Sequence, residues 1–96
     1  MDAQLQPITM PKWGMTMTEG RLSAWLVKEG ERIATGQEIM EVETEKITNV
    51  VEGHVSGLLR RIVVEEGATA PVGALLAVVA ETSVPDSEVD AFVAGY

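Results

Sequence analysis

The residue whose chemistry stands out in this chain is Lys46, in the run Glu43-Thr44-Glu45-Lys46-Ile47-Thr48. A lysine that acts as a catalytic amine needs desolvation or a cationic neighbour. The ionisable neighbours here are glutamates, and Lys12 and Lys28 are the only other lysines of the chain. The pattern therefore favours a lysine that another enzyme modifies, with an ordinary solvated lysine in a turn as the plain alternative.

Lys46 lies at the midpoint of two half-sequences that match each other at an offset of 37 residues. Two copies are too few for a solenoid, which needs about three, so we expect the copies to pair around a pseudo-twofold axis and share one core. Lys46 would then lie at the tip of the turn that joins them. The matched pairs are Gly20 with Gly57, Leu22 with Leu59, Trp25 with Ile62, Val27 with Val64, Glu29 with Glu66, Gly30 with Gly67, Gly36 with Gly73, Ile39 with Leu76 and Val42 with Val79.

Strand signals dominate residues 8–80. Residues 38–45 alternate between apolar and acidic side chains from Met40 onward, and residues 20–27, 54–64 and 74–80 are rich in apolar and β-branched side chains. No segment in this range shows a sustained helical period. The spacing of turns predicts an all-β body, either a small sandwich or a flattened barrel.

The two ends of the chain differ from this body. Residues 1–6 are expected to form a flexible N-terminus. Near the other end, Pro85 can open a helix in which Val89, Phe92 and Val93 share a face. Because a helix this short is marginal in isolation, residues 81–96 are predicted to be a linker or the start of a following domain, with one short helix.

Composition excludes several functions. The chain has no cysteine, so it can form no disulfide and no thiolate metal site. Its 15 acidic and 7 basic residues give a net charge of −8, which disfavours nucleic acid and anionic membranes as partners. We find neither a secretory signal nor a membrane-spanning run, so we expect a soluble protein of the cytoplasm.

Three runs carry a resemblance to a known family. They are Met10-Pro11-Lys12-Trp13-Gly14-Met15-Thr16-Met17-Thr18-Glu19-Gly20, Val42-Glu43-Thr44-Glu45-Lys46 and Gly53-His54-Val55-Ser56-Gly57. Over residues 7–80 the chain resembles the lipoyl domains of dihydrolipoamide acyltransferase (E2) components of 2-oxo acid and acetoin dehydrogenase complexes, and it is most similar to the acetoin type. Many members of the family have Asp-Lys-Ala at the position of Glu45-Lys46-Ile47.

The resemblance implies both fold and function. The fold would be a flattened β-barrel or sandwich of two four-stranded antiparallel sheets with pseudo-twofold symmetry, known as the lipoyl/biotinyl hammerhead or barrel-sandwich hybrid. Lys46 would carry covalent lipoic acid as a swinging arm between a thiamine diphosphate-dependent E1, the acyltransferase and dihydrolipoamide dehydrogenase. The domain alone would not be an enzyme, but part of a CoA-dependent dihydrolipoamide acetyltransferase.

The resemblance also implies partners and recognition residues. A lipoate ligase or lipoyl transferase would attach the group, and the isolated domain would be a monomer. Glu41 and Glu52 extend an acidic surface that either steers docking or merely solvates the strand edges. Trp13, Met15 and Met17 lie in a loop that would come near the modified turn, and capping of the core by Trp13 and one methionine is the alternative role. The residues expected to contribute to recognition around the turn are Glu43, Thr44, Glu45, Ile47, Trp13, Gly14 and Met15.

Two other functions compete with this interpretation. A biotinyl carrier domain shares the duplicated β architecture, but its lysine lies in a Met-Lys-Met context, whereas Lys46 lies between Glu45 and Ile47. An unmodified β-sandwich interaction module would work only through its surface. An enzyme with its own active site is disfavoured, since the sequence shows no combination of nucleophile, base and orienting residue.

Overall fold

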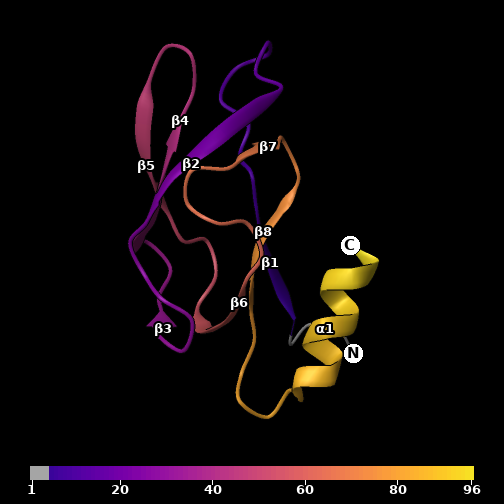
Figure 1. The fold of residues 1–96 in the computed structure, drawn as a ribbon. Helices are drawn as coiled ribbons and strands as arrows, with labels where there is room; N and C mark the ends of the chain where they lie inside the picture. The colour runs from indigo at the N-terminus through magenta and orange to yellow at the C-terminus, as the bar shows by residue number, and fades with distance from the viewer. Residues whose placement is uncertain (1–4) are drawn as a thin grey trace.

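The computed structural model describes residues 5–96, which form two layers of strands and one helix (Figure 1). The flexible segment expected over residues 1–6 falls mainly on residues 1–4, outside the described residues, and the first strand already includes Gln6. The elements are β1 (Gln6–Thr9), β2 (Glu19–Trp25), β3 (Arg32–Ile33), β4 (Glu38–Glu43), β5 (Thr48–Glu52), β6 (Gly57–Ile62), β7 (Thr69–Pro71), β8 (Leu75–Val79) and α1 (Asp86–Gly95).

The strands form two four-stranded sheets, in the orders β1-β8-β6-β3 and β5-β4-β2-β7. All neighbouring strands are antiparallel. A shift of 37 residues carries β2 onto β6, β3 onto β7 and β4 onto β8, and β1 occupies in one sheet the place that β5 has in the other. The predicted all-β fold of two four-stranded antiparallel sheets with pseudo-twofold symmetry is therefore confirmed.

The two halves hold each other by exchanging strands. Strand β2 of the first half pairs with β7 of the second, and β6 of the second pairs with β3 of the first. Leu22 N–H donates to Ala68 O at 2.9 Å, and Leu22 O accepts from Gly67 N–H at 2.7 Å. The equivalent bonds join Leu59 to Glu31 and Gly30, both at 2.8 Å. Neither half could satisfy its backbone groups alone.

Two glutamates that match in the repeat have matching structural roles. The Glu66 carboxylate accepts from Trp25 N–H at 2.7 Å, and the Glu29 carboxylate accepts from Ile62 N–H at 2.7 Å. Each carboxylate thus satisfies the end of a strand in the other half. The glycines that follow them, Gly30 and Gly67, have φ values of 93° and 91°, a left-handed conformation that favours glycine.

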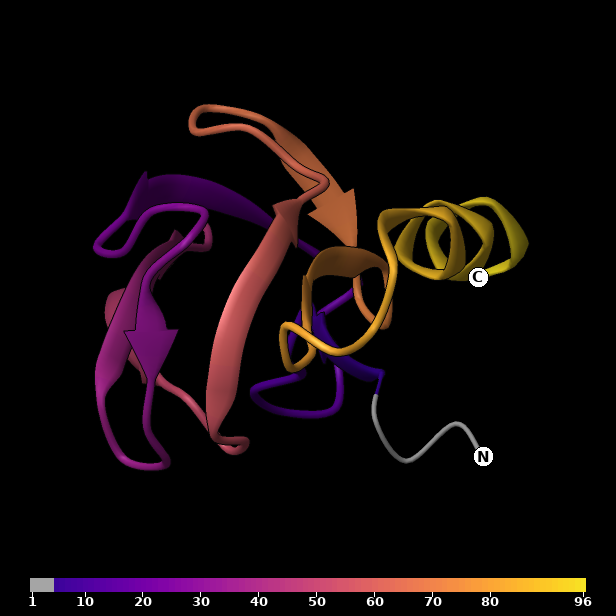
Figure 2. The same ribbon diagram turned by 90° about the horizontal axis from the view of Figure 1, so that it is seen from below.

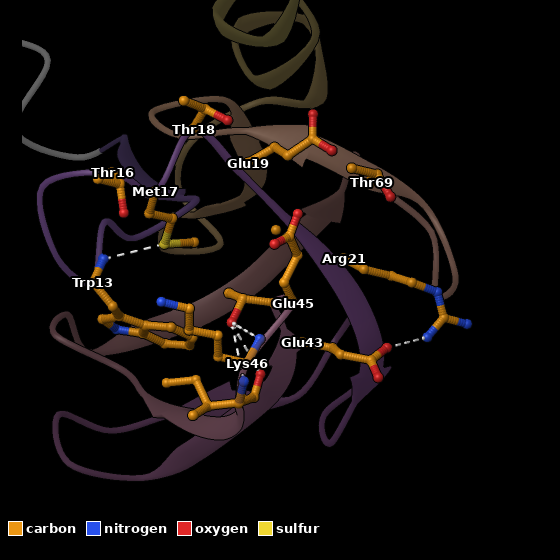
Figure 3. A pocket seen from close by; sticks show the side chains of 13 residues that line it. Trp13, Thr16, Met17, Thr18, Glu19, Arg21, Glu43, Glu45, Lys46 and Thr69 are labelled. Carbon is orange, nitrogen blue, oxygen red and sulfur yellow. Dashed lines mark hydrogen bonds and ion pairs between the residues drawn. The ribbon is translucent and has the colours of Figure 1, made fainter.

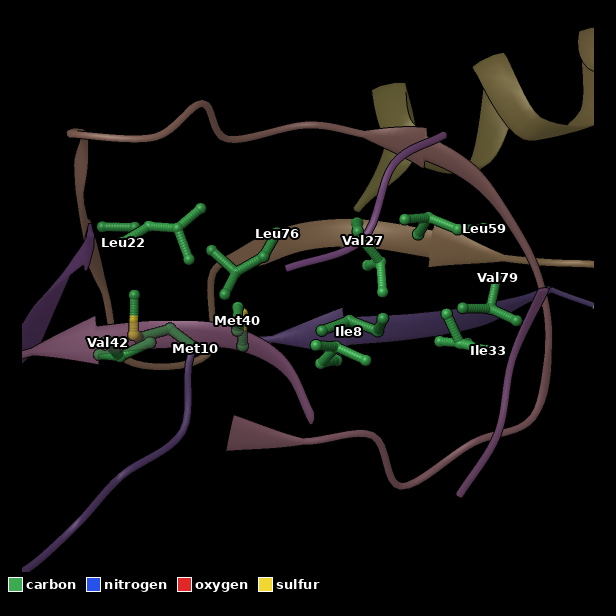
Figure 4. Packing of buried hydrophobic residues seen from close by; sticks show 13 residues of the cluster. Ile8, Met10, Leu22, Val27, Ile33, Met40, Val42, Leu59, Leu76 and Val79 are labelled. Atoms are coloured by element: carbon green, nitrogen blue, oxygen red, sulfur yellow. The ribbon is translucent and has the colours of Figure 1, made fainter. Parts of the chain in front are cut away.

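The core lies between the two sheets (Figure 4). Gly20 passes so close to it that an added Cβ would lie 2.8 Å from Val42 Cγ1 and 2.9 Å from Met10 Sδ. Within residues 5–96 this interior contains no buried polar or charged residue, so apolar packing fixes the position of the strands. Its large members are Ile8, Met10, Leu22, Val27, Ile33, Ile39, Met40, Val42, Leu59, Leu76 and Val79.

The short helix expected after Pro85 is confirmed as α1, with Pro85 as its N-cap residue. It lies at one side of the strands (Figure 2) and packs on β8, where Val89 is buried. The packing explains how so short a helix forms, because tertiary contacts supply the stability that it lacks alone. That residues 81–96 are a linker or lead into another domain stays a prediction. In the described part of the chain, no helix has the length and apolar character to cross a membrane.

Replacing Leu22 or Leu59 with alanine tests the mutual dependence of the halves. Both side chains are fully buried at equivalent positions, so each substitution should lower the free energy of unfolding by about 2–5 kcal/mol. Chemical denaturation followed by Trp fluorescence and by circular dichroism should show one coincident transition in each variant. Leu26→Ala, at an exposed position, is the matched control. Separate transitions for the two halves would contradict the shared core.

Candidate functional site

Lys46 lies at the tip of the β4–β5 hairpin, at the end of the molecule opposite the loop that enters α1 (Figure 1). The last paired residues are Glu43 and Thr48, and beyond them Thr44 N–H donates to Ile47 O at 2.7 Å. Glu45 and Lys46 are thus the two residues at the tip. The predicted position of Lys46, at the turn between the two repeats, agrees with this geometry.

The Thr44 hydroxyl closes this turn. It donates to Ile47 O at 3.2 Å, and it accepts long hydrogen bonds from Ile47 N–H at 3.3 Å and from Lys46 N–H at 3.4 Å. A side-chain oxygen here takes the part that a backbone carbonyl plays in an ordinary hairpin. Each bond is individually weak, but together they tie Lys46 and Ile47 to one hydroxyl.

The backbone of this turn is unusual for a two-residue hairpin. Such loops favour mirror-image turns that need positive φ, and hence glycine, asparagine or aspartate. No non-glycine residue within 5–96 has a positive φ, so neither Glu45 nor Lys46 is in that conformation. The side-chain bonds of Thr44 accompany a turn without positive φ, in which a lysine carries no left-handed backbone strain.

The Lys46 side chain is exposed, and its surroundings are acidic. Among residues 5–96 no ion pair or side-chain hydrogen bond involves its amine, whereas the neighbouring Glu43 is paired across the sheet with Arg21 at 2.8 Å. Glu45 is exposed and has no ion pair within the same range. A group joined to Lys46 Nζ through an amide would therefore break no contact, and this geometry fits a covalently attached cofactor.

A cleft of about 710 Å³ opens beside Lys46 (Figure 3). Trp13 and Met17 come from the loop between β1 and β2, where Trp13 N–H donates to Met17 Sδ at 3.1 Å. Both side chains also pack against the core, which agrees with the core-capping role considered for Trp13, whereas its role in recognition stays a prediction. The lining residues are Trp13, Thr16, Met17, Thr18, Glu19, Gly20, Arg21, Glu43, Thr44, Glu45, Lys46, Ile47 and Thr69.

Most of the residues expected around the turn meet in this cleft, but Gly14 and Met15 do not. Gly14 has a φ of 95° and turns the loop away, which leaves Met15 93% exposed outside the cleft. Met17, which the resemblance places with Trp13 and Met15 in a loop near the turn, does line the cleft. Sequence reasoning did not assign Arg21 or Thr69 to the turn, and Thr69 reaches it only through the pairing of β7 with β2.

Comparisons with known proteins agree with this geometry. The sequence model of the Biotin_lipoyl family, described as "Biotin-requiring enzyme", matches residues 6–79. The dihydrolipoyllysine-residue acetyltransferase components of the acetoin cleaving systems of Pseudomonas putida and Cupriavidus necator are 54% and 51% identical to the chain. The alignments cover 95% and 94% of this chain but only 25% and 24% of those proteins. The chain therefore spans about a quarter of the length of these relatives.

Solved structures support the fold. The lipoyl domain of the 2-oxoglutarate dehydrogenase complex from Azotobacter vinelandii superposes with a TM-score of 0.65 at 29% identity, covering 78% of this chain and 95% of that domain. A single-chain, multi-domain long-chain acyl-CoA carboxylase gives a TM-score of 0.66 over 96% of this chain and 9% of its own. At 16% identity the second likeness concerns the fold alone.

The chain belongs to the Biotin_lipoyl family. Its sequence relatives and the solved lipoyl domain then narrow the class: it is a lipoyl domain of the dihydrolipoamide acyltransferase type. Lipoyl domains carry lipoic acid covalently on a lysine, so lipoic acid is the cofactor. The domain by itself is a carrier.

Replacing Thr44 with valine tests how the turn is held. Valine keeps the shape of the threonine side chain but removes the hydroxyl. The backbone amides of Lys46 and Ile47 should therefore exchange hydrogen faster, as measured by NMR. The free energy of unfolding should change by about 1 kcal/mol or less, because the site is at the surface. Thr44→Ser retains the hydroxyl and should preserve the slower exchange. Unchanged exchange in Thr44→Val would show that the hydroxyl does not hold the turn.

Proposed function

We propose that Lys46 is the lipoyl-bearing residue and that the domain is the swinging-arm carrier of a dihydrolipoamide acetyltransferase in an acetoin-cleaving complex. One observation carries the assignment: an exposed lysine, free of ion pairs within residues 5–96, lies at the tip of the hairpin that joins the two halves. Lys12 is exposed in the loop after β1 and Lys28 in the turn after β2. Neither occupies the tip of a hairpin.

The chain's own residues position the amine and shape its surroundings. Joined to Nζ as an amide, lipoic acid supplies a disulfide that can be reduced and acylated, which a chain without cysteine otherwise lacks. Thr44 fixes the direction of the turn, while Trp13 and Met17 form one wall of the adjoining cleft. Tethering raises the local concentration of the arm at each enzyme that it can reach, to roughly the millimolar range for flexible links.

The proposed partners follow from the names of the relatives. An E2 component works with a thiamine diphosphate-dependent E1 and with dihydrolipoamide dehydrogenase, between which this domain would move acyl groups and reducing equivalents. A lipoate ligase or lipoyl transferase would attach the group. The relatives at 51–54% identity favour acetoin cleavage. We also propose a monomeric isolated domain and a cytoplasmic setting, the latter on the sequence observations alone.

The biotinyl alternative shares the fold but not the surroundings of the lysine. The carboxylase likeness extends over most of the chain at 16% identity, so it does not bear on which cofactor is attached. Lys46 is flanked by Glu45 and Ile47 instead of methionines. The acid side chain at the tip and the acetyltransferase relatives together favour lipoic acid.

Intact mass measurement tests the modified residue. Incubation of the apo domain with lipoate ligase, ATP and lipoic acid should add one lipoyl mass, and Lys46→Arg should abolish the gain. Lys12→Arg and Lys28→Arg are matched controls that should still be modified. Gain of the mass by Lys46→Arg would overturn the assignment, and gain of biotin from a biotin ligase in place of lipoate would favour the biotinyl carrier. No gain from either would favour the unmodified interaction module.

Substitution of the two glutamates tests electrostatic steering of E1. Glu43 is already neutralised locally by Arg21, whereas Glu45 is not, so Glu45→Gln should slow reductive acylation more than Glu43→Gln does. The difference should shrink as salt is raised, because exposed charges are screened. Rates of E1-dependent acylation in low and high salt provide the measurement. Equal slowing at both ionic strengths would mean that the carboxylates act through local contacts and not through steering.

A further inference from the structure

A second apolar cluster lies on the outer side of one sheet, away from the core. It is formed by side chains of β8 that point outward and by the segment that follows β8, and its members range from fully buried to 8% exposed. Leu5, Phe92 and Val93 pack against it. The buried members are Leu75, Val78, Ala80, Val84 and Val89.

The pseudo-twofold copy of this surface has the opposite chemistry. At the offset of 37 residues, two outward positions of β8 and the residue that follows the strand correspond to glutamates on β4, all of them at least partly exposed. The same strand is therefore acidic on the outside in one sheet and apolar in the other. Leu75 corresponds to Glu38, Val78 to Glu41 and Ala80 to Glu43.

Three arginines of the same sheet hold the segment 81–95. Arg32 makes two hydrogen bonds to the Glu81 carboxylate, at 3.1 and 3.0 Å. Arg61 pairs with Asp90 at 2.6 Å. In the other sheet, the positions that correspond to Arg32, Arg60 and Arg61 are Thr69, Ser23 and Ala24.

Arg60 is the central one of the three arginines. Its side chain is only 12% exposed, and it donates to Glu81 O at 2.8 Å, to Val84 O at 2.7 Å and to Asp86 Oδ1 at 2.6 Å. A guanidinium so little exposed needs acceptors to offset the loss of hydration. These three acceptors all belong to the segment after β8, so Arg60 is matched to that segment.

The ionisation of Glu81 agrees with this contact. The hydrogen bond from Arg32 lowers the pKa of the Glu81 carboxyl below its ordinary value. A carboxyl pKa that is lower in the folded protein adds stability at pH values above the ordinary pKa. That stability is lost as the pH falls through the lowered pKa. The pair is thus fully formed at neutral pH, and its contribution is small because both side chains are more than half exposed.

We propose that the outer face of the β1-β8-β6-β3 sheet is a docking surface whose partner is the chain's own segment 81–95. The segment then belongs to the folded domain and is not part of a mobile linker. This extends the domain beyond residues 6–79, which the family model matches, and beyond the solved lipoyl domain, which covers 78% of the chain. The proposal does not depend on lipoylation of Lys46.

Hydrogen exchange in the full chain tests the proposal directly. A ten-residue helix is marginal in water unless it is docked, so the amides of residues 89–93 should exchange at least about tenfold more slowly than in an unstructured chain. Exchange as fast as in an unstructured chain would overturn the docking.

Paired substitutions on the helix separate docking from helix formation. Val89→Asp places a charge on the buried face, so it should abolish the protection of residues 89–93 and expose the segment to proteolysis. Ala91→Asp places the same charge on the exposed face and should change neither. Slow exchange at Leu22 and Leu59 would show that the barrel stays folded. Protection of the helix that survives Val89→Asp would contradict the proposal.

Arg60→Gln tests the polar part of the surface in a milder way. It removes the guanidinium and leaves the apolar cluster in place, so helix protection should fall while the amides of Leu22 and Leu59 stay protected. Arg21→Gln is the matched control, because Arg21 pairs with Glu43 on the other sheet. Equal loss of helix protection in both variants would show that net charge, and not the contact of Arg60, accounts for the effect.

Discussion

The structure depends on the exchange of strands between its two halves. At Leu22 and Leu59 the backbone bonds of one half are completed by the turn and strand of the other, and both side chains are buried in the same core. Neither half presents a finished sheet until the other has folded. Strand β2, which takes part in this exchange, also pairs with β4, so the exchange supports the base of the hairpin that carries Lys46.

The hairpin combines a rigid base with an unencumbered tip. Strand β4 is bordered by β2 and β5, and Ile39, Met40 and Val42 anchor it in the core. Four residues later the side chains are exposed, and the turn is held by one hydroxyl. A carrier lysine needs both properties, since the enzymes that act on it require a defined approach and the arm itself requires freedom. The base and the tip differ because the alternating apolar side chains of β4 end before the tip.

Much of the fold and the position of Lys46 at a hairpin tip could be predicted from the sequence, because both follow from local and repeated signals. The offset of 37 residues predicted the pseudo-twofold, and the alternation after Met40 predicted β4 and its turn. Strands β3 and β7 have two and three residues, too few for a periodic signal. The Arg21–Glu43 pair and the approach of Thr69 to the turn depend on pairing between distant strands.

The docking of α1 was missed, although residues 74–80 carried a signal for it. They are apolar without alternation, which is typical of a strand covered on both faces. In a fold of two sheets only one face of each strand meets the core, so the other face of β8 required a further layer. The sequence patterns predict the helix and the apolar residues 74–80 separately. Only the structure shows that they pack together, through contacts of Arg60 and Val89.

The backbone of the lysine turn has a consequence for protein engineering. A mirror-image hairpin turn would reserve both tip positions for glycine, asparagine or aspartate, whereas this tip is built without positive φ and sets no such backbone restriction on L-amino acids other than proline, which would lose the Lys46 N–H donor. Position 46 is therefore suited to a synthetic amino acid introduced by codon reassignment, such as one bearing an azide or a photocrosslinker. The strands and the Thr44 hydroxyl would hold such a residue in the place that Lys46 occupies.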